Sequence, residues 1–116
     1  MIYVIDDDEI MAECVAQACG RSSKVRMFTN AIEAIQTLDS SELPDLIFLD
    51  ILLDGPDGFT FLNEMASYAD TARVPIVIVT SLDLAGKDLT EYGVVGVLEK
   101  DKMTPREIRE YVERYC

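Results

Sequence analysis

The chain contains no histidine and no tryptophan, and only 3 of its 116 residues are cysteines. Without histidine, these residues offer no histidine general base and no histidine-ligated zinc site. The cysteines are Cys14, Cys19 and Cys116, and their odd number and wide spacing predict neither a disulfide framework nor a zinc site. We expect Cys14 to fill space in the core. Free thiols are typical of a reducing compartment, so we expect a cytoplasmic protein.

Basic residues are also scarce, because 10 Lys and Arg face 22 Asp and Glu and leave a formal net charge of −12. Such a surface repels phosphate backbones, so we expect no direct nucleic-acid partner, and a cation or a basic protein face suits it better. No apolar run approaches the ~20 residues that span a bilayer, and we expect no membrane association. Apolar residues still make up 49% of the chain, enough for a packed core. The length fits one domain, residues 1–116.

Short apolar runs recur along the chain and are mostly continuous rather than alternating. Such runs, rich in Ile and Val, are typical of strands buried on both faces of a sheet. We predict strands at Ile2–Ile5, Val25–Phe28, Leu46–Leu49, Ile76–Val79 and Val94–Leu98.

Helical periods separate these runs. Apolar stripes predict a helix through Met11, Cys14, Val15 and Ala18 that ends at Gly20, and a second through Ala31, Ala34, Ile35 and Leu38 that begins after Asn30. A third helix is expected from about Gly58 to Ala66, with Leu62 and Met65 facing inward. A fourth, over about Leu84–Tyr92, contains Gly86 and has a thin apolar stripe, so we expect it to be the least stable. The fifth begins at Thr104-Pro105-Arg106-Glu107, which combines an N-cap, a proline at N1 and a glutamate at N3, and buries Ile108, Tyr111, Val112 and Tyr115.

Strand and helix therefore alternate five times, in a (βα)5 order. This alternation predicts an α/β fold in which helices cover both faces of an open, five-stranded parallel sheet. A closed barrel of parallel strands takes about 250 residues, far more than this chain has.

Polar residues follow the predicted strands. Asp6, Asp7 and Asp8 come after the first run, Asp50 after the third, Thr80 after the fourth, and Lys100 just past the fifth. Ligands bind at the carboxyl ends of the strands in such sheets. Up to three carboxylates would come together there, from Asp6, Asp7 and Asp50, and a cation would offset their mutual repulsion. Oxygen ligands with room for water suit Mg²⁺. A carboxylate beside Mg²⁺ and the Lys100 ammonium is a credible nucleophile toward phosphorus.

Each of these residues alone has a simpler interpretation. Asp8 is better explained as a helix cap than as a metal ligand, and Asp57-Gly58 as the turn and cap of the third helix. Thr80 could be structural, Asp50 a turn residue, and Lys100 a surface lysine. The joint pattern favours function, since separate strand ends all carry the residue types that one site requires.

The sequence resembles the receiver domains of response regulators, the chemotaxis-regulator fold. The resemblance covers essentially the whole chain. It rests on Val4-Ile5-Asp6-Asp7-Asp8, on Pro44 to Asp50 continuing through Asp57-Gly58, on Pro75 to Ser81, and on Gly93 to Lys100. It implies the strand order 2-1-3-4-5 in a three-layer sandwich.

The resemblance also implies roles for single residues. Asp50 would accept a phosphoryl group from the phosphohistidine of a histidine kinase or a histidine phosphotransfer protein. Asp7, Asp50 and the backbone carbonyl of Leu52 would ligate Mg²⁺ directly, and Asp6 through a water molecule. Thr80 and Lys100 would bond the phosphoryl group.

The resemblance further implies that phosphorylation switches an interaction face made by the fourth helix, the fifth strand and the fifth helix. The face would contact a downstream protein of unknown identity or a second copy in a homodimer. A domain of this kind catalyses its own phosphorylation and dephosphorylation and is not a free-standing enzyme.

The chain departs from the family pattern at three places. Val97 stands where the family usually has an aromatic residue that reports the phosphorylated state. Asp101 replaces the usual proline after the lysine, and without proline we predict a trans peptide bond there. The loop that contains Pro56 has its proline displaced. These departures concern the output and leave the phosphoryl chemistry intact.

Three other functions remain as alternatives. A pseudo-receiver that binds partners without phosphorylation usually lacks the acidic pair or the acceptor, and both are present here. A haloacid-dehalogenase-type phosphatase would use Asp6 and Asp8 as its D-x-D motif, but the chain has no strand after Lys100 to carry the further acidic pair. A flavodoxin-like carrier would need a phosphate-cradling loop after the first strand, where this chain has three aspartates.

Overall fold

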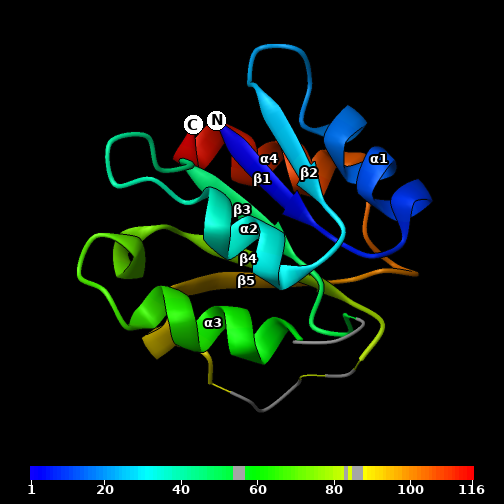
Figure 1. The fold of residues 1–116 in the computed structure, drawn as a ribbon. Helices are drawn as coiled ribbons and strands as arrows, with labels where there is room; N and C mark the ends of the chain where they lie inside the picture. Colours follow the sequence, from blue (N-terminus) through cyan, green and yellow to red (C-terminus); the bar gives the residue numbers. More distant parts are fainter. Residues whose placement is uncertain (54–56, 83, 85–87) are drawn as a thin grey trace.

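Five parallel strands form one sheet with helices on both of its faces. The computed structural model describes residues 1–53, 57–82, 84 and 88–116. The strands are β1 (Ile2–Ile5), β2 (Val25–Phe28), β3 (Leu46–Leu49), β4 (Ile76–Thr80) and β5 (Val94–Glu99). Their order is β2-β1-β3-β4-β5, so the implied strand order is confirmed (Figure 1).

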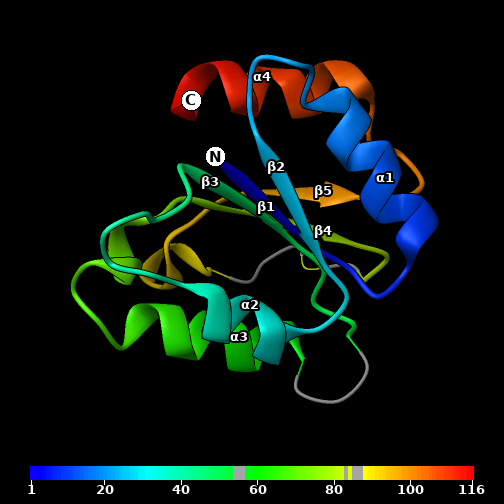
Figure 2. The same cartoon turned by 45° about the horizontal axis from the view of Figure 1, so that its top comes forward.

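The α-helices of the described residues are α1 (Glu9–Ala18), α2 (Ala31–Thr37), α3 (Gly58–Ala66) and α4 (Pro105–Tyr115). In Figure 2, α1 and α4 lie on one side of the sheet, and α2 and α3 lie on the other. One apolar cluster, which includes Val15, Phe48 and Ile108, packs beneath α1 and α4. A second, which includes Ile47 and Phe61, packs beneath α2 and α3. Burial on both faces explains why the strands are continuous apolar runs.

Side chains cap the helices at the expected positions. Asp8 accepts hydrogen bonds from the N–H groups of Ile10 and Met11 and begins α1. Asn30 and Asp57 cap α2 and α3 in the same way. Thr104 and Glu107 form a complete capping box at α4. These contacts satisfy N–H groups that have no partner within the helix, and they confirm the predicted helix starts.

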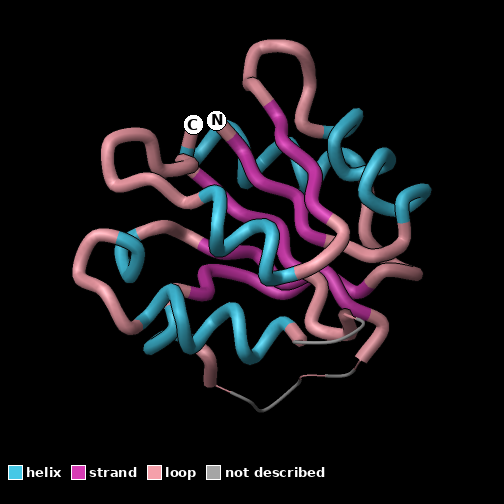
Figure 3. The backbone as a smooth tube through the Cα atoms, viewed as in Figure 1, coloured by secondary structure: helices cyan, strands magenta, loops and turns pink. Residues whose placement is uncertain are grey.

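The expected helix over Leu84–Tyr92 is not an α-helix where the structure describes it. Thr90–Tyr92 forms a single 3-10 turn, η2, and Leu84, Asp88 and Leu89 lie outside any helix. Residues 83 and 85–87, which include Gly86, lie outside the described residues, as does the loop residue Pro56. The thin apolar stripe gives this segment little to bury, so packing does not favour a longer helix. Figure 3 shows the described helices in cyan and the strands in magenta, with the strands side by side between the helices.

The inward face of α1 also differs from the prediction. Ala12, Val15 and Cys19 are buried, whereas Cys14 is exposed, so the expectation that Cys14 fills the core is wrong. The predicted and the observed buried stripes share Val15 but are rotated by about one residue around the helix. Small apolar residues lie on both stripes, so the sequence allows either one to face inward. Packing against the sheet and α4 selects the stripe that the sequence leaves ambiguous.

The described residues contain no helix with both the length and the apolar character of a bilayer-spanning segment.

Candidate functional site

The sheet register places the acidic residues of two strands side by side. Ile5 pairs with Leu49 across β1 and β3, so Asp6 and Asp50 leave the sheet at the same level. The backbone continues this alignment, because the Asp50 N–H donates to the carbonyl of Ile5 at 2.9 Å. The carboxyl ends of β1 and β3 thus position one carboxylate each at the same edge of the sheet.

Asp7 completes a cluster of three carboxylates. One oxygen from each of Asp6, Asp7 and Asp50 lies within 4.8 Å of the others. Asp6 and Asp50 are each only 3% exposed, whereas Asp7 is partly exposed. Carboxylates at this distance repel one another unless a positive charge lies among them.

Lys100 supplies such a charge from the end of β5. Its Nζ atom lies 3.0 Å from an oxygen of Asp6 and 3.1 Å from an oxygen of Asp50. Burial opposes the charge on this ammonium, but the hydrogen bonds and charges of the two aspartates outweigh it and raise the pKa of Lys100. The lysine is therefore a cation held between two buried carboxylates.

Burial acts in the opposite sense on Asp6. Loss of solvent raises the pKa of its carboxyl group, although the Asp8 N–H and the Lys100 ammonium partly offset this effect. The Asp8 N–H donates to Asp6 Oδ1 at 2.9 Å. The ionised form of Asp6 is thus costly in the native protein, which is a common property of functional sites.

Backbone donors orient the other polar groups. The Leu52 N–H donates to Asp50 Oδ1 at 3.0 Å, so the backbone of Leu52 lies beside this carboxylate. Thr80 is fully buried at the end of β4, next to β3, and its hydroxyl oxygen accepts a hydrogen bond from the Leu82 N–H at 3.2 Å. The hydroxyl proton of Thr80 is left to be donated elsewhere.

The structure also describes two of the departures from the family pattern. Val97 is 42% exposed on β5, a strand at the edge of the sheet. The described residues contain no cis peptide bond, so the bond between Lys100 and Asp101 is trans, as predicted.

The cluster fits a hard divalent cation. Asp6, Asp7 and Asp50 offer only oxygen atoms, and the partial exposure of Asp7 leaves the site open to water. All-oxygen ligands with access to water are what Mg²⁺ requires. The aspartates could therefore hold a metal ion.

Sequence reasoning missed two features beside the cluster. A cavity of about 330 Å³ adjoins Asp6 and is lined by Glu9 and Glu13 of α1 and by Met27. The spacing of these glutamates, four residues apart on one helix, was a usable signal. Gly58 is the second feature, because it packs directly on the backbone of Asp50 and Ile51. The sequence alone does not show which backbone lies against a glycine at the start of a helix.

Comparisons with known proteins agree with this architecture. A family model described as the response regulator receiver domain matches residues 2–113. A protein-glutamate methylesterase/protein-glutamine glutaminase 2 from Shewanella sp. (strain MR-4) is 29% identical over 117 residues, covering 95% of this chain and 32% of that protein. The chain thus spans about a third of the length of such methylesterases.

Solved structures share the whole fold. A candidate response regulator from Chloroflexus aurantiacus superposes with a TM-score of 0.84 at 29% identity, covering 98% of this chain and 94% of that one. The receiver domain of NtrX from Brucella abortus gives a TM-score of 0.82 at 24% identity, covering 99% of this chain and 97% of the other. At 24% identity, the similarity to the NtrX receiver domain concerns the fold alone.

Proposed function

The chain belongs to the response regulator receiver domain family, and on this premise we propose that residues 1–116 act as a phosphoacceptor module in two-component signalling. Asp50 accepts a phosphoryl group from the phosphohistidine of a histidine kinase or a histidine phosphotransfer protein. The observation that carries this proposal is the Lys100 ammonium, held at 3.0 and 3.1 Å between the carboxylates of Asp6 and Asp50. An ion pair with a purely structural role would need only one of these two carboxylates.

The transfer forms an acyl phosphate. An oxygen of Asp50 makes the new bond to phosphorus, while the phosphorus–nitrogen bond of the donor breaks and its electron pair leaves with the imidazole. Lys100 donates to a phosphoryl oxygen in place of a carboxylate oxygen, and the Thr80 hydroxyl donates to another. Both residues lie at the carboxyl ends of strands of the same sheet, Thr80 at the end of β4 and Lys100 just past β5.

The proposal includes Mg²⁺ as the cofactor. Asp7, Asp50 and the carbonyl of Leu52 would hold the ion directly, and Asp6 through water. When bound, the ion offsets negative charge on the aspartates and on the transferred phosphoryl group. The partial exposure of Asp7 suits this proposal, because it leaves the cluster accessible to the water molecules that Mg²⁺ retains.

We further propose a cytoplasmic module whose phosphorylation changes contacts with a downstream protein or with a second copy, and which has no free-standing enzymatic activity. The face would include β5 and α4. Because Val97 stands where the family usually has an aromatic residue, its side chain cannot report the phosphorylated state by ring rotation. The methylesterase activity named for the relatives belongs to longer proteins and is not assigned here.

The alternatives predict different chemistry. A pseudo-receiver binds partners but acquires no phosphoryl group, and the complete set of aspartates and Lys100 argues against it. A haloacid-dehalogenase-type phosphatase would use Asp8 as an acid near Asp6. In the structure, the Asp8 side chain is occupied in capping α1, which disfavours this role.

Intact-mass measurement tests the proposal. The protein is incubated with acetyl phosphate, with and without Mg²⁺, beside the variants Asp50→Asn and Asp8→Asn. We expect an alkali-labile increment of one phosphoryl group that requires Mg²⁺, is lost in Asp50→Asn and persists in Asp8→Asn, because asparagine also caps helices. An alkali-stable increment, or one that survives in Asp50→Asn, would refute the assignment of Asp50. Catalytic turnover of a phosphate ester would favour the phosphatase.

A further inference from the structure

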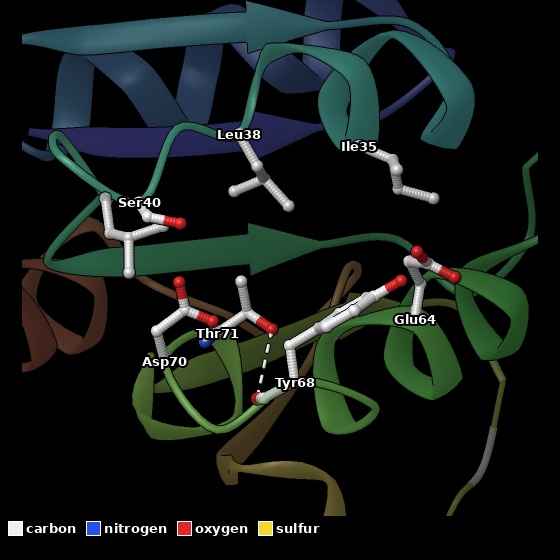
Figure 4. Close-up of a pocket in the computed structure, with 8 residues that line it drawn as sticks. Ile35, Leu38, Ser40, Glu64, Tyr68, Asp70 and Thr71 are labelled. Carbon is white, nitrogen blue, oxygen red and sulfur yellow. Dashed lines mark hydrogen bonds between the residues drawn. The ribbon is translucent and has the colours of Figure 1, made fainter.

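A second cavity lies at the opposite edge of the sheet from Asp50. It has a volume of about 250 Å³ and opens between the end of α2 and the segment that follows α3. Helices in this fold run antiparallel to the strands, so their carboxyl ends lie where the strands begin. Figure 4 shows Ile35 and Leu38 on one wall, facing Glu64, Tyr68 and Asp70 on the other.

The two walls differ in chemistry. Ile35, Leu38 and Leu43, from α2 and the loop that follows it, are apolar and partly buried. The opposite wall carries the carboxylates of Glu64 and Asp70 with the ring of Tyr68 between them (Figure 4). No lysine or arginine lines the cavity among the described residues. A ligand that fits both walls needs an apolar body and a positive charge.

The two carboxylates are not equivalent. Asp70 accepts a hydrogen bond from the Thr71 N–H at 2.9 Å, and hydrogen bonding by the Ser40 side chain is the largest cause of its lowered pKa. Glu64 is partly buried, and across the described chain no hydrogen bond or ion pair engages its carboxylate. An unpaired, partly desolvated charge gains more from an incoming cation than a fully hydrated one does.

Tyr68 presents an aromatic face beside this free carboxylate. Its side chain is 58% exposed although it directly follows the cap of α3. The Thr71 hydroxyl fixes the turn that carries it, donating to the carbonyls of Met65 at 2.6 Å and Tyr68 at 3.3 Å. A cation placed over a tyrosine ring next to a carboxylate gains from both groups.

We propose that this cavity receives an arginine side chain presented by a partner protein. The flat guanidinium group stacks on Tyr68 and donates to Glu64, while the aliphatic stem packs against Leu38 and Leu43. Lysine fits less well, because its compact ammonium group is strongly hydrated and cannot stack.

The shape of the cavity favours a protein over a free small molecule. Sites for small molecules usually bury 70–90% of the ligand, whereas the exposed ring of Tyr68 leaves one side of this cavity open. The ligand must therefore be held by contacts beyond the cavity, as a side chain on a protein surface is. The net charge of −12 attracts a basic partner face. Arg73, the nearest cation along the chain, lines a separate groove with Val95 and leaves Glu64 available.

NMR titration of the ¹⁵N-labelled protein tests the chemistry of recognition. The probe is N-acetyl-arginine N-methylamide, and its control is the neutral, isosteric citrulline derivative. We expect the arginine probe to shift the amide signals of Leu38, Glu64 and Tyr68 with a dissociation constant in the low-millimolar range, and the citrulline probe to leave them unchanged. Glu64→Gln should weaken binding about threefold, as for a partly exposed ion pair. Tyr68→Leu should weaken it by a similar factor.

Two controls separate this site from the rest of the molecule. Glu113→Gln removes an exposed carboxylate from α4, on the other side of the sheet, and should leave binding unchanged. Asp50→Asn should also leave it unchanged, so the inference stands or falls independently of phosphorylation. Equal shifts with the citrulline probe, or full affinity in Glu64→Gln, would overturn the proposal. Tighter binding of putrescine than of the arginine probe would also overturn it, because that result indicates a site for free diamines.

Discussion

Gly58 offers a direct test of how backbone packing positions Asp50, the proposed phosphoacceptor. A Cβ atom at this position would lie 2.6 Å from Ile51 Cα, 2.7 Å from the Asp50 carbonyl oxygen and 2.8 Å from Ile51 Cδ1. Ordinary contacts begin at 3.4 Å, so the start of α3 and the backbone of Ile51 must separate by 0.8 Å, the difference between 3.4 and 2.6 Å. The two nearest atoms belong to the backbone and cannot swing aside.

Gly58→Ala should therefore destabilise the protein and displace Asp50. Overpacking of this kind costs about 1–3 kcal/mol. The better helix propensity of alanine returns at most about 1 kcal/mol. A shift of nearly 1 Å at a reacting group can cost about 100-fold in rate. We expect the free energy of unfolding to fall by about 1–2 kcal/mol, and phosphorylation by acetyl phosphate to slow by roughly 10-fold or more.

Urea unfolding followed by far-ultraviolet circular dichroism gives the first quantity, and the rate of the intact-mass increment gives the second. Gly20→Ala is the matched control, because Gly20 has a φ of +85° and a Cβ atom there would have no neighbour within 4 Å. Alanine at this position costs about 1 kcal/mol of backbone strain without touching the site. Gly20→Ala should be phosphorylated at the wild-type rate. Wild-type stability and rate in Gly58→Ala, or equal slowing in both variants, would contradict the role given to the packing of Gly58.

Two further predictions concern other close contacts and charges. Gly96→Ala places a methyl group against the Tyr111 hydroxyl, so it should destabilise the protein, and less so in a Tyr111→Leu background. Urea unfolding of the wild type, the two single variants and the double variant should give a coupling free energy of at least about 0.5 kcal/mol. Additive effects of the two substitutions would contradict the contact. Because burial raises the pKa of Asp6, the native carboxyl group binds its proton at a pH where the unfolded chain has released it. The contribution of Asp6 to stability without metal should thus rise as the pH falls through the native pKa toward 3.8. Asp6→Asn should lose this part of the pH dependence in thermal unfolding, and a profile parallel to the wild type would contradict it.

The sheet was predictable because its strands carry a strong local signal. The observed strands begin where the apolar runs begin, and β4 and β5 each extend one residue further, to Thr80 and Glu99. A strand buried on both faces must be apolar at every position, and few other structures produce such short runs between polar segments. The caps of the helices were equally local, since Asp8 and Thr104 act within three residues of themselves.

The face of α1 and the segment before β5 were not predictable in the same way. Alanines and cysteines in α1 allow two inward faces, and contacts with residues far along the chain select the one with Cys19. For Leu84–Tyr92, weak periodicity allowed a helix that the described residues do not form. Where the local signal is weak, tertiary packing decides the structure.

Sequence reasoning grouped the acidic residues of the site correctly but could not give their environments. The rule that ligands bind at the carboxyl ends of strands brings Asp6, Asp7 and Asp50 together, as the structure does. That Lys100 lies between two of them depends on β5 lying two strands away from β3, an order that the family resemblance implies but that the pattern of apolar runs alone does not give. The burial that raises the pKa of Asp6 likewise depends on the packed fold.

The charge of the site would couple cation binding to the proposed phosphoryl transfer. Three carboxylates and one ammonium give a formal charge of −3 + 1, or −2, in a largely buried cluster. A phosphoryl group on Asp50 would replace one negative charge by nearly two. Lys100 already offsets the charge of two aspartates, so it cannot serve a phosphoryl oxygen without leaving one of them unpaired. A divalent cation held by the aspartates would offset their charge, so that the ammonium could donate to the phosphoryl group. Lys100→Ala should therefore reduce the response to phosphorylation more than the affinity for Mg²⁺, and equal losses would contradict this division of roles.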